Sequence, residues 1–517
     1  AGQLLGFVGM DGKGLEGLER SMEEHLGGQS SRQPVQRDAT GRRFYLRTEG
    51  RDDPSGKPLA LTLDVQVQFF VEEALERVAT EHKAKWAGCL IVDVPTGDIL
   101  AWGQYPFFNP NAYRDFTPAQ YRNRLAQDAI EPGSTMKPFV VAAAMQEKLI
   151  GRDTIFKCEG GKWETKTITI RDEKGYDDLP VHKIIRYSSN IGAAKIGLAL
   201  GARKYHQYLS QLGFGGHSAL PLAESKGILR QPRDWSEADI ISTAFGQSIS
   251  VTAVQMVQAY LTLVNGGVYK PLRIVADAEA QPPAPLRRIF HERVSREVLA
   301  MMREVVEEDG TGKRARIDGV QVGGKTGTAQ KADRRSGTYG AARTASFVGV
   351  APIDKPRYLA LVMVDEPVNV QYGSLVAAPV FQEVISRTMA YQGYFPDVSL
   401  AMGPPRPSEF AKQEKRQAAA RAAEKPSAKE DSALFGKKEI RRTVASGIMP
   451  AGNQVPDVVG KSVRMAVEAF AGRGVVPVIR GEGQKVVRQS PEAGAHWPAG
   501  RENTEYVLWL STLQEGM

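Results

Sequence analysis

The first strongly patterned part of the chain predicts a helix followed by a β-hairpin. Apolar residues recur at helical spacing over 65–82, directly after Leu61-Thr62-Leu63-Asp64, which reads as a strand end or turn that leads into the helix. Two apolar runs, 87–94 and 98–104, flank the turn residues Pro95-Thr96-Gly97. This arrangement is typical of two antiparallel strands joined by a tight turn.

Helical and strand-like patterns then follow each other in blocks. Apolar residues at helical spacing predict three further helices, at 134–148, 191–212 and 252–264. Apolar runs predict three later strands, at 319–330, 345–351 and 357–365. Runs of helix between a hairpin and later strands indicate an α/β fold of the α+β type, in which helices pack on an antiparallel sheet.

Both ends of the chain differ from this central part. Residues 1–58 are glycine-rich and charged and contain one amphipathic helical stretch, 14–26, so we expect them to be part of an N-terminal accessory domain. Residues 401–453 are rich in Pro, Ala, Lys, Glu and Arg and predict a linker. The central domain is therefore expected to span 59–400.

A small α+β unit is predicted at 454–512. A helical pattern at 462–472 is followed by three short strand patterns, at 475–479, 486–489 and 505–510. A unit of this length is near the lower limit for independent folding.

The composition is that of a large globular protein. The chain has 517 residues, of which 42% are hydrophobic and 24% charged, and this length favours more than one domain. Its formal net charge of +8 would suit an anionic partner, although solubility is the simpler explanation. No zinc-finger spacing or RNA-recognition motif accompanies the charge, so no nucleic-acid partner is expected.

The cysteines and the hydropathy indicate whether a metal site, a redox motif or a membrane-spanning segment is to be expected. Cys89 and Cys158 stand alone, with no CxxC or Cys/His cluster, so neither a metal site nor a redox motif is expected. No window reaches the roughly 18 to 20 consecutive apolar residues that span a bilayer. Because the chain starts at Ala1 in the middle of a pattern, a preceding membrane anchor that is absent from this sequence is compatible with it.

The first candidate motif is Ser134-Thr135-Met136-Lys137. If a helix begins here, the i and i+3 positions share a face, and the Lys137 amine can reach the Ser134 hydroxyl. A serine becomes a good nucleophile when a neighbouring base takes its proton, and lysine can do so when desolvation or nearby positive charge lowers its pKa. Pro132-Gly133 and Pro138 place Ser134 at a helix N-terminus.

The second candidate motif is Ser188-Ser189-Asn190, expected on a loop before the helix that starts at 191. Ser188 can pass a proton between a lysine and a leaving group, and Asn190 can donate to a substrate amide. Ser and Asn are also favoured at helix caps, and this triplet alone fits that structural role at least as well.

The third candidate motif is Lys325-Thr326-Gly327-Thr328, in a strand-like stretch. Such a strand can pair with an extended peptide, and Lys325 with the threonine hydroxyls can bind a carboxylate. Strict alternation does not place Lys325 and Thr328 on one face, so a twist or bulge near Gly327 is expected. The alternative is an ordinary strand that contains glycine.

The three motifs in this order resemble those of penicillin-binding proteins and serine β-lactamases. The chain as a whole is similar to a class B penicillin-binding protein of the division-type FtsI kind, with a C-terminal PASTA domain from 454. The start of the chain resembles the end of that family's non-catalytic pedestal. Further stretches that carry the resemblance are Leu61-Thr62-Leu63-Asp64, Ala345-Ser346-Phe347-Val348-Gly349 and Ala377-Ala378-Pro379-Val380-Phe381.

The resemblance implies a penicillin-binding transpeptidase fold and a serine acyl-transfer reaction. Ser134, activated by Lys137, would attack the D-Ala-D-Ala bond of a peptidoglycan stem peptide, and an amine of a second stem would resolve the acyl-enzyme. By the same resemblance, Ser188 and Lys325 would help proton transfer, and Asn190 would hold the peptide. Thr326, Gly327 and Thr328 would lie at the terminal carboxylate, and the backbone N–H groups of Ser134 and Thr328 would form the oxyanion hole.

The resemblance also implies the setting of the reaction. β-Lactams would acylate Ser134, and no metal or organic cofactor is implied. Relatives act at the extracytoplasmic face of the cytoplasmic membrane beside an FtsW-type glycan polymerase and divisome proteins. The acceptor amine, diaminopimelate or lysine, stays open.

Four alternatives remain beside the septal transpeptidase. A serine β-lactamase needs a base for deacylation, and no Glu-x-x-Leu-Asn stretch lies between Asn190 and Lys325. A D,D-carboxypeptidase would use the same residues with water as acceptor. An elongation-type transpeptidase differs only in its cellular role. A catalytically inert wall-binding or sensor protein would have no need for both Lys137 and Lys325.

Overall fold

The computed structural model describes two compact units, Ala1–Gly403 and Pro404–Met517, and each is described here by itself. The described residues are 1–28, 35–37, 40, 43–45, 56–276, 286–332, 339–368, 370–394, 455–459, 461, 466, 469–470, 477–480, 485–493, 495 and 507–511. The predicted linker, 401–453, lies outside them.

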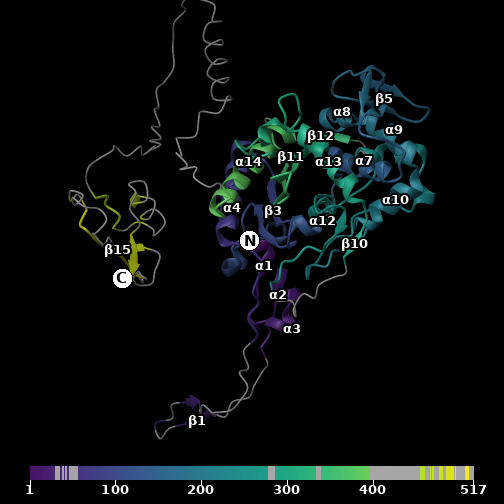
Figure 1. Cartoon of the computed structure of the whole chain (residues 1–517). Helices are drawn as coiled ribbons and strands as arrows, with labels where there is room; N and C mark the ends of the chain where they lie inside the picture. The colour runs from purple at the N-terminus through teal and green to yellow at the C-terminus, as the bar shows by residue number, and fades with distance from the viewer. Residues whose placement is uncertain are drawn as a thin grey trace, which may run out of the picture. The chain divides into compact units, whose positions relative to one another are not determined.

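A five-stranded antiparallel sheet forms the centre of the first unit (Figure 1). Its strands, in spatial order, are β11 (Gly323–Ala332), β12 (Tyr339–Ala351), β13 (Tyr358–Asp365), β3 (Trp86–Asp93) and β4 (Ile99–Tyr105). The predicted hairpin of 87–94 and 98–104 is confirmed as β3 and β4. The three later strands are confirmed as well, and they place β11, which carries the third motif, at one edge of the sheet.

Two helices cover one face of this sheet. Helix α4 (Val65–Glu81) and helix α14 (Gly373–Tyr391) lie against each other and against the strands (Figure 1). The Asp64 carboxylate caps α4 by accepting from the N–H groups of Gln66 and Val67 at 2.9 and 3.0 Å. Such a cap stabilises a helix by about 1 kcal/mol.

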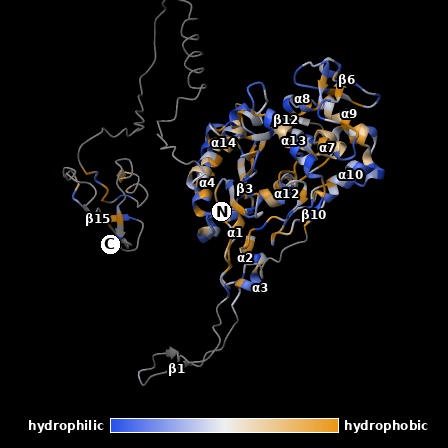
Figure 2. Ribbon diagram, in the orientation of Figure 1, coloured by the Kyte–Doolittle hydropathy of each residue, from blue (hydrophilic) through white to orange (hydrophobic). Residues whose placement is uncertain are grey.

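Most of the other helices form a layer on the opposite face. The main ones are α7 (Lys137–Gln146), α9 (Asn190–Leu200), α12 (Ala253–Val264) and α13 (Glu292–Glu304). Figure 2 shows α7, α9 and α12 as largely apolar ribbons. Successive β3 residues point to opposite faces: Leu90 and Val92 enter the core under these helices, and Cys89 and Ile91 enter the core under α4 and α14. The sheet is therefore buried on both faces, which fits its continuous apolar runs.

Shorter elements complete the first unit. They are α1 (Gly2–Leu5), α2 (Gly17–Ser21), α3 (Glu23–Leu26), β1 (Val35–Arg37), β2 (Arg43–Tyr45), η1 (Pro110–Asp115), α5 (Pro118–Tyr121), α6 (Arg124–Gln127), η2 (Gly133–Met136), β5 (Ile155–Lys157), η3 (Glu159–Gly161), β6 (Lys162–Glu164), β7 (Thr169–Arg171), β8 (Asp178–Pro180), α8 (Val181–Tyr187), α10 (Ala202–Gln211), η4 (Pro232–Asp234), α11 (Glu237–Ala244), β9 (Val268–Tyr269), β10 (Arg287–Arg288) and η5 (Lys313–Ala315).

Two predicted helices are broken in the structure. The helix expected at 191–212 is two helices, α9 and α10, because Gly201 between them adopts φ 77°, a left-handed conformation that glycine tolerates. The helix expected at 14–26 is likewise two short helices, α2 and α3, which meet at Met22. In both cases apolar residues at helical spacing continued across the break.

The second unit contains a three-stranded sheet. Its strands are β14 (Val478–Arg480), β15 (Lys485–Ser490) and β16 (Val507–Ser511), with β16 in the middle, parallel to β14 and antiparallel to β15. The three predicted strands are thus confirmed. Most of the predicted helix 462–472 lies outside the described residues, although Ala466 and Phe470 are buried in the small core with Val458 and Leu508.

None of the helices in the described part of the chain is both long enough and apolar enough to span a lipid bilayer.

Candidate active site

The first motif lies on a tight turn that leads directly into helix α7. Ser134 is in the 3-10 turn η2, and Lys137 is the first residue of α7, with Pro138 in the first helical turn. The Lys137 Nζ lies 2.9 Å from the Ser134 Oγ. Ser134 is half-buried, whereas Lys137 is fully buried. The nucleophile is thus reachable while its neighbouring amine is shielded from water.

Hydrogen bonds to the backbone of this turn hold it in place. Gly133 adopts φ 59°, a left-handed conformation, and its N–H donates to the Gly246 carbonyl at 2.9 Å. The buried Tyr260 hydroxyl donates to the Thr135 carbonyl at 2.7 Å. These bonds hold the residues on both sides of Ser134 in place.

The second motif joins helices α8 and α9. Ser188 ends α8 in a left-handed conformation, and Asn190 begins α9. The middle residue, Ser189, caps α9 by accepting from the Gly192 N–H at 3.0 Å. The triplet therefore contains a helix cap, as the structural alternative expected, and the two outer residues point to Lys137 instead.

The Lys137 amine has four oxygen neighbours and no carboxylate partner among its hydrogen bonds. It lies 2.5 Å from the Ser188 carbonyl oxygen, 2.7 Å from Asn190 Oδ1 and 3.1 Å from Ser188 Oγ, besides the Ser134 Oγ. A neutral amine has two N–H donors and one lone pair. If the donors bind the Ser188 carbonyl and Asn190, the lone pair is left for the hydroxyl hydrogen of Ser134.

The third motif brings a second buried lysine to the same place. The Lys325 Nζ lies 2.8 Å from the Ser188 Oγ and 3.0 Å from the Thr326 carbonyl oxygen. The Thr326 Oγ1 lies 3.2 Å from the Thr311 Oγ1, and the Thr328 Oγ1 accepts from the Gly373 N–H at 3.3 Å. The Ser188 hydroxyl therefore lies between the two lysines.

Of the twist or bulge expected near Gly327, the bulge is wrong. The pairing of β11 with β12 is regular from Gly323 to Gln330, and the register shifts only between Gln330 and Ala332. Gly327 is needed for close packing instead. A Cβ atom at this position would lie 2.3 Å from the Ser346 Oγ and 2.9 Å from the Thr135 Cγ2. Only glycine lets the strand approach the turn of Ser134 this closely.

Burial depresses the basicity of both lysines. Desolvation lowers the pKa of Lys137 to about 7, against an opposing effect of the Asp172 and Glu173 carboxylates. Desolvation also lowers the pKa of Lys325 well below its usual value, and the nearby Lys137 lowers it further. Because two cations this close repel each other, protonation of one lysine disfavours protonation of the other.

Sequence reasoning missed residues that position the second motif. The Asp172 carboxylate accepts from the Ser189 hydroxyl at 2.6 Å and from the N–H groups of Asn190 and Ile191 at 2.5 and 3.1 Å. The Asn190 amide nitrogen donates to the Arg171 carbonyl at 2.9 Å. Asp172 carries no motif, and only the pairing of distant segments reveals it.

Sequence reasoning also left His182 without a partner. Its Nδ1 lies 2.8 Å from the Glu304 Oε2, and Glu304 also pairs with Arg152. This network joins α13 to the start of α8, the helix that ends at Ser188. Cys89 is a buried free thiol in β3, and Cys158 is a buried free thiol beside Ser189.

The comparisons with known proteins agree with this geometry. Residues 87–386 match the penicillin binding protein transpeptidase domain, and residues 453–512 match the PASTA domain. The probable peptidoglycan D,D-transpeptidase PenA of Neisseria gonorrhoeae is 35% identical over 400 residues, which are 76% of this chain and 67% of that protein. The peptidoglycan D,D-transpeptidase FtsI of Escherichia coli K12 is 32% identical over 396 residues, 76% of this chain and 66% of that protein.

A solved structure is similar to this chain in both fold and sequence. The transpeptidase domain of Burkholderia pseudomallei penicillin-binding protein 3 superposes with a TM-score of 0.59 at 30% identity, covering 65% of this chain and 98% of that one. The family match covers more than half of the chain and contains all three motifs. The chain therefore belongs to the penicillin-binding protein transpeptidase family and carries a PASTA domain at its C-terminal end.

Proposed function

We propose that this protein is a peptidoglycan D,D-transpeptidase that works through an acyl-enzyme on Ser134. The observation that carries the proposal is the buried Lys137 amine, 2.9 Å from the Ser134 hydroxyl, with its pKa lowered to about 7. A lysine in this state is neutral in a large fraction of molecules at neutral pH and can act as a general base.

The first step is attack on the D-Ala-D-Ala peptide bond of a stem peptide. The Ser134 Oγ forms a bond to the carbonyl carbon while its proton moves to the Lys137 Nζ. The backbone N–H groups of Ser134 and Thr328 stabilise the negative charge on the carbonyl oxygen. The close approach of β11 to the serine turn at Gly327 supports this pairing of donors.

The second step expels D-alanine. The bond between the carbonyl carbon and the D-alanine nitrogen breaks, and this nitrogen receives the proton that Lys137 took from Ser134. The Ser188 hydroxyl, which lies 3.1 Å from the Lys137 amine and 2.8 Å from the Lys325 amine, is placed to pass that proton from the lysine to the leaving nitrogen. An amine of a second stem peptide then attacks the ester, and the same groups work in reverse. The acyl group is transferred from the Ser134 oxygen to the nitrogen of the acceptor amine, which forms the new amide and regenerates Ser134.

Substrate binding falls to the groups around this centre. Asn190 uses one N–H on the Arg171 carbonyl and keeps its second N–H for a substrate amide. The Thr328 hydroxyl accepts from the Gly373 N–H and keeps its hydrogen for the terminal carboxylate. Lys325, Thr326 and Gly327 line the same strand and complete the carboxylate site. β-Lactams react at Ser134 because they mimic this substrate.

The cellular setting is part of the same proposal. The names of the relatives from Neisseria and Escherichia support a peptidoglycan substrate. We propose that the protein works at the extracytoplasmic face of the cytoplasmic membrane in septal synthesis, beside an FtsW-type polymerase. We also propose the domain boundaries 1–58 for the pedestal part, 59–400 for the transpeptidase domain, 401–453 for the linker and 454–512 for the PASTA domain.

The proposal is tested by the intact mass of the protein before and after treatment with benzylpenicillin. We expect one stable adduct on the wild type and on the control Ser210→Ala, since Ser210 is exposed on α10, a helix that carries none of the three motifs. We expect no adduct on Ser134→Ala. An unmodified wild type with a native melting transition would contradict the proposal, and rapid loss of the adduct would favour a β-lactamase.

A further inference from the structure

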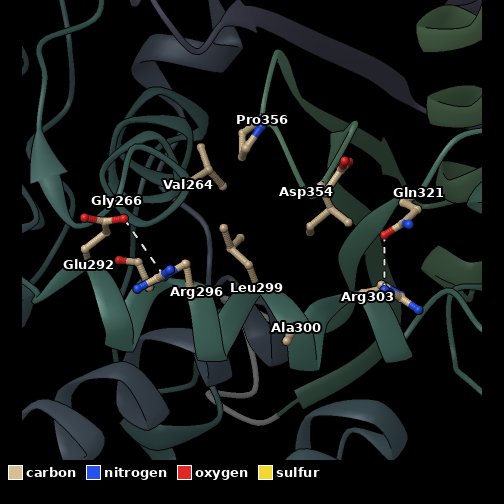
Figure 3. A pocket seen from close by; sticks show the side chains of 12 residues that line it. Val264, Gly266, Glu292, Arg296, Leu299, Ala300, Arg303, Gln321, Asp354 and Pro356 are labelled. Atoms are coloured by element: carbon tan, nitrogen blue, oxygen red, sulfur yellow. Dashed lines mark hydrogen bonds and ion pairs between the residues drawn. The ribbon is translucent and has the colours of Figure 1, made fainter.

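A groove with a volume of about 410 Å³ runs along helix α13, apart from all residues of the three motifs (Figure 3). Sites for small molecules usually have volumes of roughly 300 to 1,000 Å³. One wall of the groove is a stripe of α13 in which residues recur at helical spacing. This stripe contains Glu292, Ser295, Arg296, Leu299, Ala300 and Arg303.

The opposite wall comes from three separate segments. They are the end of α12 and the turn after it, the residue stretch before β11, and the turn between β12 and β13. Val264, Leu299 and Ile353 are at most 8% exposed and form an apolar floor, and Pro356 extends this floor toward solvent. An apolar body can therefore bury hydrocarbon surface here.

A buried hydroxyl in this groove lacks a partner. Ser295 is 0% exposed, and its Oγ has no hydrogen bond within the part of the chain that the structure describes. A serine inside a helix usually bonds the carbonyl four residues earlier, or reaches water. Ser295 does neither, and its hydroxyl lies fully buried beneath the wall of the groove, where it has no contact with solvent.

Two arginines lie at the rim of the groove, about two helical turns apart. Arg296 has only a distant carboxylate, Glu292 at 3.9 Å. Arg303 donates to the Gln321 Oε1 at 3.1 Å and has its nearest carboxylate, Glu307, at 3.9 Å (Figure 3). Neither guanidinium therefore makes the paired, two-bond contact with a carboxylate for which its shape is suited.

The rim also carries acidic groups. Glu292 faces Arg296, and Asp354, on the turn between β12 and β13, is exposed and has no ion pair among the described residues. Asp354 disfavours an anion beside that turn. An anionic group is therefore best placed on the α13 side of the groove, next to the arginines.

We propose that this groove is a second binding site, for a small carboxylic acid with an apolar body. The carboxylate pairs with a guanidinium group at the rim, that of Arg296 or of Arg303, and the apolar body lies over Leu299 and Ile353. The proposal does not depend on acyl transfer at Ser134, since no residue of the groove belongs to that site.

The probe is 4-phenylbutyrate, matched with 4-phenylbutylamine and 4-phenylbutanamide. Binding is followed by methyl NMR on the whole chain, with the Leu299 and Ile353 methyl groups as reporters. We expect the acid to bind with a Kd on the order of 1 mM, typical of a fragment of this size, and to shift both methyl groups. The amine and the amide are expected to bind at least tenfold more weakly.

Variants separate this site from non-specific binding. The double variant Arg296→Gln/Arg303→Gln is expected to weaken binding of the acid at least tenfold. The control Arg293→Gln, on an outward-facing position of the same helix, is expected to leave it unchanged. Ser295→Ala should raise the melting temperature of the free chain and leave binding of the acid unchanged, because the buried hydroxyl does not reach the groove. All variants should still acylate with penicillin at the wild-type rate.

Three results would overturn the proposal. They are binding of the amine as tight as that of the acid, binding of the acid that survives the double arginine substitution, and the absence of any shift of the Leu299 and Ile353 methyl groups at 10-fold the expected Kd.

Discussion

Strand β11 carries two lysines whose surroundings differ in kind. Lys325 is fully buried and meets the Ser188 hydroxyl and a backbone carbonyl, so burial lowers its pKa. Lys331, six residues further along, is also partly buried, but it binds Asp365 at 2.9 Å and Glu366 at 2.8 Å. Burial alone would lower the pKa of Lys331, yet these hydrogen bonds raise it.

The difference shows how one strand can provide both chemistry and stability. A lysine that is paired with carboxylates is held in its charged form and contributes to the fold. A lysine buried among hydroxyls and carbonyls is less costly to bury as a neutral amine, and it can take part in proton transfer. Lys137 belongs to the second kind, because its four oxygen neighbours include no carboxylate.

The largest effect is expected from exchanging each lysine of β11 for methionine. Lys325→Met should lower the rate of acylation by benzylpenicillin at least about 100-fold, since the substrate carboxylate and the Ser188 hydroxyl lose the Lys325 amine as a hydrogen-bond and proton-transfer partner. Lys331→Met should change this rate less than about twofold. Stopped-flow or quenched-flow acylation measures both. Equal losses in the two variants would show that the lysines do not differ in function.

Lys331→Met should instead lower the stability of the fold, although it hardly changes the rate of acylation. Asp365 is 4% exposed, and loss of Lys331 leaves it with only the Thr344 hydroxyl among its side-chain partners. We expect the free energy of unfolding to fall by about 1 to 2 kcal/mol at pH 7. Because the raised pKa of Lys331 stabilises the fold below its unfolded value, the deficit should shrink above about pH 10.5. Urea denaturation at pH 7 and at about pH 11.5 measures it, and a deficit that does not shrink would exclude the ion pair as its cause.

A smaller effect is expected at Lys137. Its pKa is lowered to about 7 in the folded chain, so between about pH 7 and 10.5 the unfolded chain binds more protons and stability rises with pH. Lys137→Met should remove this slope and stabilise the protein at pH 7 by about 1 kcal/mol. Denaturation of both proteins across this pH range measures the slope. A variant that is less stable than the wild type at pH 7 would show that the amine is held charged.

Local patterns were sufficient for the parts of the fold that depend on neighbouring residues. The hairpin of β3 and β4 followed from two apolar runs on either side of a few turn residues. The pairing of β13 with β3 joins segments more than 250 residues apart, so no local pattern contains it. Gly201 shows another limit, since helical spacing of apolar residues continued across a position whose backbone ends a helix.

The residues of the candidate site likewise fall into those that local motifs predicted and those that depend on contacts between distant segments. The residue types and order of the three motifs pointed to Ser134, Lys137, Ser188, Asn190 and Lys325, and the structure brings all five side chains together. Asp172 and the pair of His182 with Glu304 could not be predicted, because their partners are far away in the sequence. The groove along α13 was equally hidden, since its two walls come from four segments.

The measurement that tests the central claim most directly is the pH dependence of benzylpenicillin acylation in the wild type, with folding checked at each pH. If the neutral Lys137 amine takes the proton of Ser134, the rate should rise with pH and level off above a pKa of about 7. It should then be about thirtyfold lower at pH 5.5 than on the plateau. A rate that stays constant from pH 5.5 to 8.5 would contradict the account, because Lys137 would then not be the group that activates Ser134.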